Sequence, residues 1–434
     1  MYNWCDMIIN KALKLKLNPS TEQYSEFITS FGCCRFIYNF YLAERNKFYE
    51  KEIKPLGNDK KAKEEAWKKF KETSLRDLKN KYPWLKEADS QGICNSYMDL
   101  RGAFNRFYKG LANLPKFHSK KSKNSYRSSV IRRNCINWNK HYIKVPKIGK
   151  VKFYQSNAPK WYKNRIKICN LTFSKTPGND IYVSINFEVK VKLQEKKFDN
   201  DNQAIGLDFD CDDMYIDSNG KSALKDYGFE KHKQLNNKKL SRLQRQLSKK
   251  LKNSKNREKV RIKLARFEEH IANCRRDWIE KETSRLVNSY QVIGIENLSI
   301  KGMMMGSKNA KNYLDISWST FVTRLEQKAK FKNCQVIKVD KFFASSQLCS
   351  SCSYKNPDVQ KHHLESWTCP RCGQVHQRDE NAALNIKNEA IRVLRQAEKN
   401  QLNSSSKENL SDSPLLETVN QELRNVTNGN EGIN

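Results

Sequence analysis

The stretch that decides the fold is "QAIGLDFDCDDMYIDSNG", which spans Gln203–Gly220. Its apolar beginning predicts a buried strand, and that strand ends in the acids Asp208 and Asp210. A second short strand and a turn follow at once, so the whole stretch predicts a β-hairpin. Sheets covered by helices on both faces bind ligands at the carboxyl ends of their strands, which is where this pattern places Asp208.

Two more buried strands are predicted downstream of the hairpin, from "YQVIGIEN" at Tyr290–Asn297 and "CQVIKVD" at Cys334–Asp340. A helix is expected between them, over Ser317–Asn333. Residues 231–281 carry 18 Lys/Arg and repeat apolar residues at helical spacing, which predicts a helical hairpin with a basic outer face. These elements together predict a sheet with helices between its strands.

Three acids occur in the order strand, strand, helix: Asp208, Glu296 and Asp379, the last within "QRDENAALNIKNEA". Any one of them alone is most simply a strand-end or helix-capping residue. Converging carboxylates hold hard cations such as Mg²⁺, and two such ions activate water and stabilise the leaving oxygen of a phosphodiester. The order of the three acids therefore predicts a ribonuclease-H-like nuclease core. Asp210 is a rival of Asp208, because both share a face if the strand continues, and we prefer Asp208.

The spacing of four cysteines predicts a zinc ribbon. Cys349-x-x-Cys352 and Cys369-x-x-Cys372 are separated by 16 residues, which places four thiolates around one tetrahedral Zn²⁺. Four sulfur ligands leave no open position for water, so this site is expected to be structural. His376 could replace a cysteine as ligand, but we expect an ordinary polar residue there.

The N-terminal half predicts a helical segment set between strands. "KALKLKLNPS" (Lys11–Ser20) alternates apolar and basic residues, as a half-buried strand does. Its last residue forms a capping-box pattern with Gln23, so a mainly helical segment is expected over 19–112, interrupted at Gly32. Short strands over 113–200 are expected to close a small barrel, with the first strand added to it.

The composition indicates a polyanionic partner. The 82 Lys/Arg exceed the 47 Asp/Glu to give a formal net charge of +35, and nucleic acid is the simplest partner for such a chain. We find no apolar run of membrane-spanning length and no secretory signal, so we expect no membrane partner, reduced cysteines and a cytoplasmic protein. Residues 398–434 hold three Lys/Arg against six Asp/Glu and are expected to form an acidic, disordered tail.

Basic residues interleaved with aromatics are the candidates for nucleic-acid contacts, because cations neutralise phosphates and aromatic rings stack on unpaired bases. The alternative is a solvated basic face over aromatics that belong to the core. The candidates are Arg101, Arg106, Lys109, Lys116, Lys120, Lys121 and Arg127, with Arg242 and Arg245 of the predicted hairpin. No G-x-G-x-x-G or Walker-type loop occurs, so a nucleotide-driven enzyme is not supported.

Several segments together resemble the TnpB (insertion-sequence OrfB) family, transposon-encoded relatives of the miniature type V CRISPR effector nucleases. They are "AIGLDFD", "VIGIENLSIKGMM", "VDKFFASSQLCSSC" and "WTCPRCGQVHQRDENAALNI", with "LPKFHSKKSKNSYR" earlier in the chain. The resemblance covers about residues 8–390. The chain departs from it at Asp210 and at Ser353, where many members have glycine.

The resemblance implies an RNA-guided DNA endonuclease. A guide RNA pairs with target DNA beside a short flanking motif, and one RuvC-type site with two Mg²⁺ (or Mn²⁺) ions cuts the DNA. Asp208, Glu296 and Asp379 match the family's RuvC carboxylates, and the four cysteines match its ribbon, which holds one Zn²⁺. The alternatives are a nuclease-silent RNA-guided repressor, a CRISPR-associated effector rather than a transposon protein, and a transposase that joins strands itself.

The fold class expected on this basis is α+β and multidomain, with an RNase H-like (RuvC) nuclease core, a zinc ribbon, a β-barrel wedge domain and a helical recognition domain. Such an enzyme would be associated with the nucleoid of a prokaryote. The expected order is wedge strand 1–18, recognition domain 19–112, remaining wedge 113–200, RuvC core 201–345 including the basic hairpin 231–281, ribbon 346–376, final RuvC helix 377–397 and acidic tail 398–434.

Overall fold

The chain divides into two compact units, each built from segments that are distant in the sequence. The C-terminal unit is formed mainly by Gln194–Leu235 and Cys274–Asn434, and the N-terminal unit by Trp4–Leu193 and Asn236–Asn273. The computed structural model describes residues 4–121, 124–128, 135–194, 198–211, 213–223, 229–299, 302–303, 317–362 and 364–408.

A four-stranded sheet, in the order β11-β10-β8-β9, forms the centre of the C-terminal unit. Strands β8 (Ala204–Asp210), β10 (Val292–Glu296) and β11 (Gln335–Val339) are parallel. Strand β9 (Met214–Asp217) pairs with β8 in antiparallel orientation. The hairpin and both later strands are therefore confirmed, because runs of buried apolar residues determined them locally.

Helices cover both faces of this sheet. On one face, Ile205 and Ile293 pack against α6 (Lys255–Ser289) and α9 (Trp318–Lys330) in one apolar cluster. On the other face, Ala204 and Val292 pack against α11. The two faces alternate along each strand, as the period-2 geometry of a strand requires. Helix α9 also confirms the helix expected between the two later strands.

Helix α11 (Arg378–Glu408) corrects the expected start of the C-terminal tail. We placed that start at residue 398, but the helix continues to Glu408. Residues 398–408 contain no glycine or proline, so nothing in the sequence stops the helix from propagating. The rest of the predicted tail, 409–434, lies outside the described residues.

The predicted ribbon lies between β11 and α11 in the sequence. It contains the short helix α10 (Asp358–Lys361) and the antiparallel pair of β12 (Ser366–Thr368) with β13 (Val375–Gln377). Trp367 packs with two of the cysteines in a small buried cluster. So little apolar surface makes an additional stabilising element necessary, as a metal would be.

A seven-stranded sheet forms the centre of the N-terminal unit, in the order β2-β6-β7-β1-β5-β4-β3. The first strand was expected as an addition to the sheet, but it lies in the middle of this order. Among the described residues β2 and β3 stand at the two ends, so closure into a barrel stays a prediction. The strands are β1 (Trp4–Asn18), β2 (Asn124–Ser128), β3 (Ile136–Asn137), β4 (Tyr142–Val145), β5 (Gly149–Phe153), β6 (Arg165–Lys175) and β7 (Ile181–Gln194).

The helical segment between β1 and β2 begins as predicted. Ser20 Oγ accepts the backbone N–H of Gln23, and the Gln23 side chain accepts the backbone N–H of Ser20, which completes the capping box. The α-helices are α1 (Thr21–Phe48), α2 (Lys60–Lys68), α3 (Leu75–Lys81) and α4 (Ser90–Tyr108). Shorter turns are η1 (Tyr49–Ile53), η2 (Lys54–Leu56) and η3 (Pro83–Glu87), with η4 (Lys160–Asn164) and η5 (Asp201–Gln203) further along the chain.

The interruption expected at Gly32 was wrong, because α1 passes through this position without a break. Glycine inside a helix costs about 1 kcal/mol relative to alanine. On both sides of it, α1 buries large side chains such as Phe27, Phe31 and Ile37. Their burial contributes about 1.5–3 kcal/mol each, which outweighs the local cost of the glycine.

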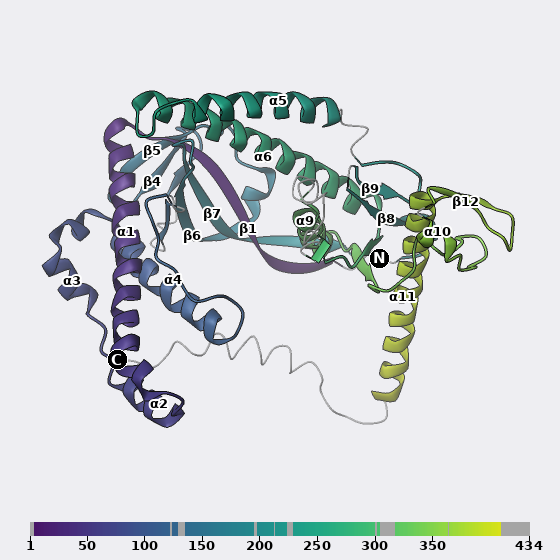
Figure 1. Cartoon of the computed structure of the whole chain (residues 1–434), viewed down its shortest axis with the longest axis horizontal. Helices are drawn as coiled ribbons and strands as arrows, with labels where there is room; N and C mark the ends of the chain where they lie inside the picture. The colour runs from purple at the N-terminus through teal and green to yellow at the C-terminus, as the bar shows by residue number, and fades with distance from the viewer. Residues whose placement is uncertain are drawn as a thin grey trace. The chain divides into compact units, whose positions relative to one another are not determined.

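Helices α5 (Phe229–Ser248) and α6 form the predicted basic hairpin and lie side by side in Figure 1. The middle of this hairpin, Asn236–Asn273, groups with the N-terminal unit, whereas the sequence interpretation placed the whole hairpin in the nuclease core. The named domains and their other boundaries stay a prediction. Across the described residues, no helix combines the length and the apolar character needed to cross a membrane.

Candidate functional site

Two of the three predicted acids lie at the ends of neighbouring parallel strands. In β8 and β10, Leu207 and Ile295 are register partners, and the next residues along the two strands are Asp208 and Glu296. Everything before them in both strands is buried, while the two acids are half-buried. The parallel register therefore brings both carboxylates to the carboxyl edge of the sheet.

Two glycines bring α11, and with it Asp379, to the same edge. Gly206 and Gly294 are register partners, and both face the helix. A Cβ on Gly206 would lie 2.0 Å from the carbonyl oxygen of Ala383, and one on Gly294 would lie 2.8 Å from that of Ile386. The helix backbone thus occupies the space where side chains would otherwise project. Asp379 is the second residue of α11, so this close approach positions the third acid.

The electrostatics show that the three acids interact. Burial raises the pKa of Asp208 well above its usual value, and the negative charges of Glu296 and Asp379 raise it further. Burial also raises the pKa of Glu296, although Ser345 Oγ donates a hydrogen bond to its Oε1 at 3.0 Å and opposes the shift. Within the described part of the chain, the Asp208 carboxylate accepts no hydrogen bond. A half-buried carboxylate that lies next to other carboxylates and has no hydrogen-bond donor suits a bound cation.

One arginine partly neutralises this cluster. Arg378 Nε donates to Asp379 Oδ1 at 2.8 Å, and its positive charge lowers the pKa of Asp208 against the other effects. The hydrogen bond to Asp379 raises the pKa of the guanidinium in turn. The donor set as a whole is three carboxylates, and carboxylate oxygens are the ligands that Mg²⁺ and Mn²⁺ prefer. The residues therefore fit the divalent ions expected from the sequence.

The rival acid, Asp210, has a different place. It pairs with Met214 across the β8–β9 hairpin, and its Oδ1 accepts the backbone N–H of Asp213 at 2.6 Å. Met214 has a φ of +69°, so the hairpin turn is tight and this hydrogen bond supports it. Asp210 still contributes negative charge next to Asp208. Asp208 therefore stays the preferred candidate ligand; Asp212 lies outside the described residues.

Sequence reasoning missed two asparagines that connect the acids to the ribbon. Asn385 Nδ2 donates to the carbonyl oxygens of Ser345 and Leu348, at 2.8 and 2.7 Å. Asn381 Nδ2 also donates to the Leu348 carbonyl oxygen at 2.7 Å, and its Oδ1 accepts the backbone N–H of Ser350. The signal was present in the sequence, since two asparagines four residues apart lie on one face of a helix.

The four predicted zinc ligands converge. Each of Cys349, Cys352, Cys369 and Cys372 offers a sulfur, and these sulfurs all lie within 4.8 Å of one another. The Sγ atoms of Cys349 and Cys372 are 3.6 Å apart, and so are those of Cys352 and Cys369. In each knuckle a backbone N–H returns to the first cysteine's carbonyl oxygen, from Ser353 at 2.8 Å and from Gly373 at 2.9 Å. A tetrahedral thiolate site for Zn²⁺ fits this arrangement.

The environment of these thiols differs from one to the next. Desolvation raises the pKa of Cys369, but backbone N–H groups of Cys372 and Arg371 lower it more, to about 7. Thiolates are the form that binds zinc, so this cysteine is ready to bind near neutral pH. His376 is not the ordinary polar residue that we expected: its side chain is buried, and its Nε2 lies 3.0 Å from Cys349 Sγ. Burial lowers the pKa of the imidazole, which favours a neutral ring in contact with the sulfur.

The candidates for nucleic-acid contacts are distributed over several elements of the N-terminal unit. Arg101 and Arg106 are exposed on α4, and Arg242 and Arg245 are exposed on α5. Arg127 of β2 forms an ion pair with Asp99, between its Nη2 and Oδ1 at 2.9 Å. The remaining candidates, Lys109, Lys116, Lys120 and Lys121, are exposed after α4.

The aromatics among these basic residues divide into two groups. Phe104 and Tyr126 belong to the core, as the alternative interpretation held. Tyr108 and Phe117 expose more than half of their side chains, at 61% and 56%. Only the second group is available for stacking on bases.

The fold and the site define an α+β protein of two units, with three carboxylates at a sheet edge and a four-cysteine cluster beside them. Three family models match the chain: "Helix-turn-helix domain" of OrfB over residues 7–54, "Probable transposase" over residues 184–306 and "Cas12f1-like, TNB domain" over residues 318–386. These matches confirm the resemblance to the TnpB (insertion-sequence OrfB) family that the motifs predicted.

Curated relatives and a solved structure agree with this result. The chain is 27% identical over 379 residues to a "Putative RNA-guided DNA endonuclease" of Streptomyces pristinaespiralis, covering 87% of this chain and 89% of that protein. It is 27% identical over 392 residues to "Putative RNA-guided DNA endonuclease InsQ" of Escherichia coli (strain K12), covering 87% and 91%. A chain in "Cryo-EM structure of the Cas12f1-sgRNA-target DNA complex" has the same fold, with a TM-score of 0.50 and 14% identity over 88% of this chain and 99% of that one.

Proposed function

We propose that this protein is an RNA-guided DNA endonuclease, in which a guide RNA selects the DNA and a single RuvC-type site hydrolyses phosphodiester bonds. The names of both relatives, which the chain matches over 89% and 91% of their length, support the proposal. The observation that carries it is Asp208, a half-buried carboxylate without a hydrogen-bond donor among the described residues, whose pKa the charges of Glu296 and Asp379 raise further. Such a charge cluster is unfavourable unless the site exists to bind cations.

Asp208, Glu296 and Asp379 would hold two Mg²⁺ or Mn²⁺ ions. When bound, the ions supply an activated water and stabilise the 3′-oxygen leaving group. The chain's own contribution is to hold the ligands in place. Ser345 fixes the orientation of the Glu296 carboxylate by its hydrogen bond, and Arg378 does the same for Asp379. The close approach of α11 to the glycine pair fixes the distance between the helix acid and the strand acids.

Cys349, Cys352, Cys369 and Cys372 would hold one structural Zn²⁺. Four sulfurs complete the coordination, so this ion takes no part in hydrolysis. His376 beside Cys349 acts as a neighbour of the ligand set rather than as a fifth ligand. A neutral ring that donates its Nε2–H to a thiolate would reduce the negative charge of the cluster.

The proposed partners are a guide RNA and target DNA with a flanking motif. Base pairing supplies sequence choice, while the protein holds the heteroduplex by its backbone with the exposed basic candidates of α4, α5 and the stretch after α4. The assignment of the N-terminal unit to a wedge and a recognition domain belongs to the same proposal. An enzyme of this kind acts on DNA in the cytoplasm, at the nucleoid of a prokaryote.

The experiment is a cleavage assay with the full chain and the RNA that copurifies with it. Sequencing that RNA gives the scaffold and the guide, and a matching DNA library gives the flanking motif. We expect Mg²⁺-dependent cutting by the wild type. Asp208→Ala should lower the rate by at least about 10³-fold, because one of the three proposed carboxylate ligands is lost, and leave RNA binding unchanged.

Other outcomes separate the alternatives. Tight binding of an intact target by the wild type, at saturating Mg²⁺, would make the protein a guided repressor. Full activity of Asp208→Ala would indicate that Asp210, and not Asp208, is the metal ligand. Strand-transfer products would identify a transposase.

A further inference from the structure

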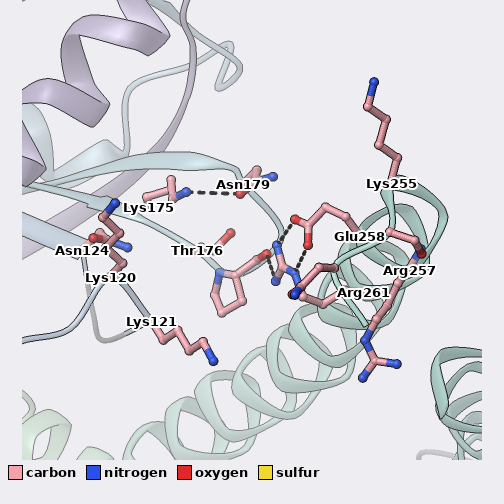
Figure 2. A pocket seen from close by; sticks show the side chains of 13 residues that line it. Lys120, Lys121, Asn124, Lys175, Thr176, Asn179, Lys255, Arg257, Glu258 and Arg261 are labelled. Atoms are coloured by element: carbon pink, nitrogen blue, oxygen red, sulfur yellow. Dashed lines mark hydrogen bonds and ion pairs between the residues drawn. The ribbon is translucent and has the colours of Figure 1, made fainter. Parts of the chain in front are cut away.

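A basic cavity of about 1100 Å³ lies within the N-terminal unit and is separate from both metal centres. One wall is formed by Lys120, Lys121 and Asn124, the end of β6 and the β6–β7 turn. The other wall is formed by the α5–α6 turn and the beginning of α6, as Figure 2 shows. Its charged lining consists of one acid, Glu258, and six cations: Lys120, Lys121, Lys175, Lys255, Arg257 and Arg261.

Hydrogen bonds fix the two walls to each other. Arg261 Nη1 donates to the carbonyl oxygen of Pro177 at 3.0 Å, and Arg266 Nε donates to that of Gly178 at 3.2 Å. Gly178 lies so close to α6 that a Cβ on it would meet Arg266 Cγ at 2.8 Å. Glu258 accepts two hydrogen bonds from the Arg261 guanidinium, at 2.7 and 2.6 Å, and holds it in this position. The cavity is therefore a defined feature of the fold.

Both arginines that line the cavity have structural roles. Arg261 holds the turn, and its charge is balanced by Glu258. Arg257 Nη1 donates to the carbonyl oxygens of Leu247 and Lys250, which caps the end of α5. A ligand that bound either guanidinium would have to break these hydrogen bonds.

The four lysines are different, because their charges are not balanced. The structure records no ion pair for Lys120, Lys121 or Lys255 among the described residues, and all three are exposed. Among the described residues, the one recorded contact of Lys175 Nζ is a 3.3 Å hydrogen bond to Asn179 Oδ1. Burial lowers the pKa of Lys175, and the positive charge of Arg261 lowers it further. The negative charge of an anion in the cavity would oppose this lowering of the pKa.

The distribution of the lysines indicates the kind of anion. They stand on both walls of a cavity far larger than one phosphate group, with Lys120, Lys121 and Lys175 opposite Lys255 (Figure 2). A small anion would reach one wall only. A polyanion with regularly spaced charges would reach both, and the backbone of a nucleic-acid strand has this property.

We propose that this cavity binds the phosphodiester backbone of a nucleic-acid strand through Lys120, Lys121, Lys175 and Lys255, while Arg257, Glu258 and Arg261 build it. The inference rests on the proposed function, which provides RNA and DNA as ligands. It adds a backbone-binding site at the junction of the β6–β7 turn and the basic hairpin. Contacts of this kind fix the position of a strand without selecting its sequence.

The test compares two double variants of the full chain. Lys175→Gln/Lys255→Gln removes one cation from each wall, and Lys259→Gln/Lys263→Gln removes two exposed lysines of α6 that do not line the cavity. Binding of labelled single-stranded RNA, single-stranded DNA and duplex DNA is measured from low to high salt. The slope of log K against log salt should become less steep by about 0.7 per lysine for a single strand and about 0.9 for a duplex.

The control variant should keep the wild-type slope, and the strand type that changes identifies the natural ligand. Lys175→Arg/Lys255→Arg should restore the slope, which separates lost charge from a damaged fold. Wild-type slopes for the cavity variant with all three probes would overturn the proposal. Equal competition by inorganic phosphate and by an oligonucleotide, at matched phosphate concentration, would also overturn it.

The cleavage assay keeps this inference separate from the proposed function. If the wild type cuts no target but nucleic-acid binding by the cavity variant depends less steeply on salt, the cavity proposal is supported and the nuclease proposal fails. If the wild type cuts and the cavity variant binds every probe as tightly as the wild type, only the cavity proposal fails.

Discussion

The two candidate metal sites of the C-terminal unit are built in opposite ways. The four cysteines come from two short turns within Cys349–Cys372, and their sulfurs all lie within 4.8 Å of one another. The three carboxylates come from two strands and a helix, and no trio of carboxylates among the described residues converges as closely as the sulfurs do. One site is determined by local chain geometry and the other by tertiary packing. Their sensitivity to substitution should differ accordingly.

Removing a cysteine should have the largest effect, confined to the first site. Cys349→Ser takes one ligand from a closed tetrahedral centre, so the zinc content should fall from about one ion per chain to near zero. The carboxylates are held by α11 on the sheet, so Mg²⁺ affinity should fall by less than about tenfold. Metal analysis and Mg²⁺ titration of the melting temperature measure the two effects. Unchanged zinc content would refute the ribbon.

Adding one methyl group should damage the second site and spare the first. In Gly206→Ala the new Cβ would meet the backbone of α11 at 2.0 Å, and a backbone cannot give way as a flexible side chain can. We expect a loss of about 3 kcal/mol in the free energy of unfolding, and loss of cleavage with zinc content retained. Gly102→Ala is the matched control, because nothing lies within 4 Å of its Cβ. It should be neutral or raise stability by about 0.5–1 kcal/mol.

At the carboxylate site, the stabilising effect of Mg²⁺ should depend on pH. The pKa of Asp208 is raised in the folded state, so the folded protein binds its proton more tightly than the unfolded chain. Without metal, the free energy of unfolding should fall as pH rises from about 4, where the unfolded carboxyl titrates, through the raised pKa. Mg²⁺ should therefore raise the melting temperature more at about pH 8 than at about pH 5. Asp208→Asn should reduce this difference, and an equal effect of Mg²⁺ at both pH values would contradict the argument.

The smallest expected effect is at the first knuckle. Ser353 has a φ of +59° and Gly373, at the same place in the second knuckle, has a φ of +73°. The left-handed region is unfavourable for serine, so Ser353→Gly should strengthen zinc retention against a chelator by up to about 1 kcal/mol. Gly373→Ala should weaken it by a similar amount. Weaker zinc retention in Ser353→Gly, or stronger retention in Gly373→Ala, would contradict this argument.

The same contrast explains what the sequence could predict. The cysteine spacing and the capping box of Ser20 and Gln23 are local patterns, and the structure has both. Strands β8 and β10 were also recognisable, because each is a run of buried apolar residues. The three acids were found by their order and by the family resemblance. Their interaction depends on contacts between segments that no local pattern describes.

What the sequence could not predict is mostly tertiary in origin. The role of Gly206 and Gly294 depends on a helix more than 80 residues further along the chain. The hydrogen bond from Ser345 to Glu296 and the contact of His376 with Cys349 depend on loop placement. The central position of β1 depends on which strands pair, which alternation alone does not decide. Each of these features joins residues whose spacing carries no periodic signal.

The glycine pair and Asp208 have opposite consequences for how such a protein can evolve. Replacing Asp208 by a neutral residue of similar size would relieve repulsion among the three carboxylates, so loss of cutting is accessible in one step and costs no stability. Replacing Gly206 would disturb the scaffold itself. Selection for binding alone would thus let the acids drift and keep the glycines. A lineage that has become silent should be recognisable by intact glycines beside altered acids.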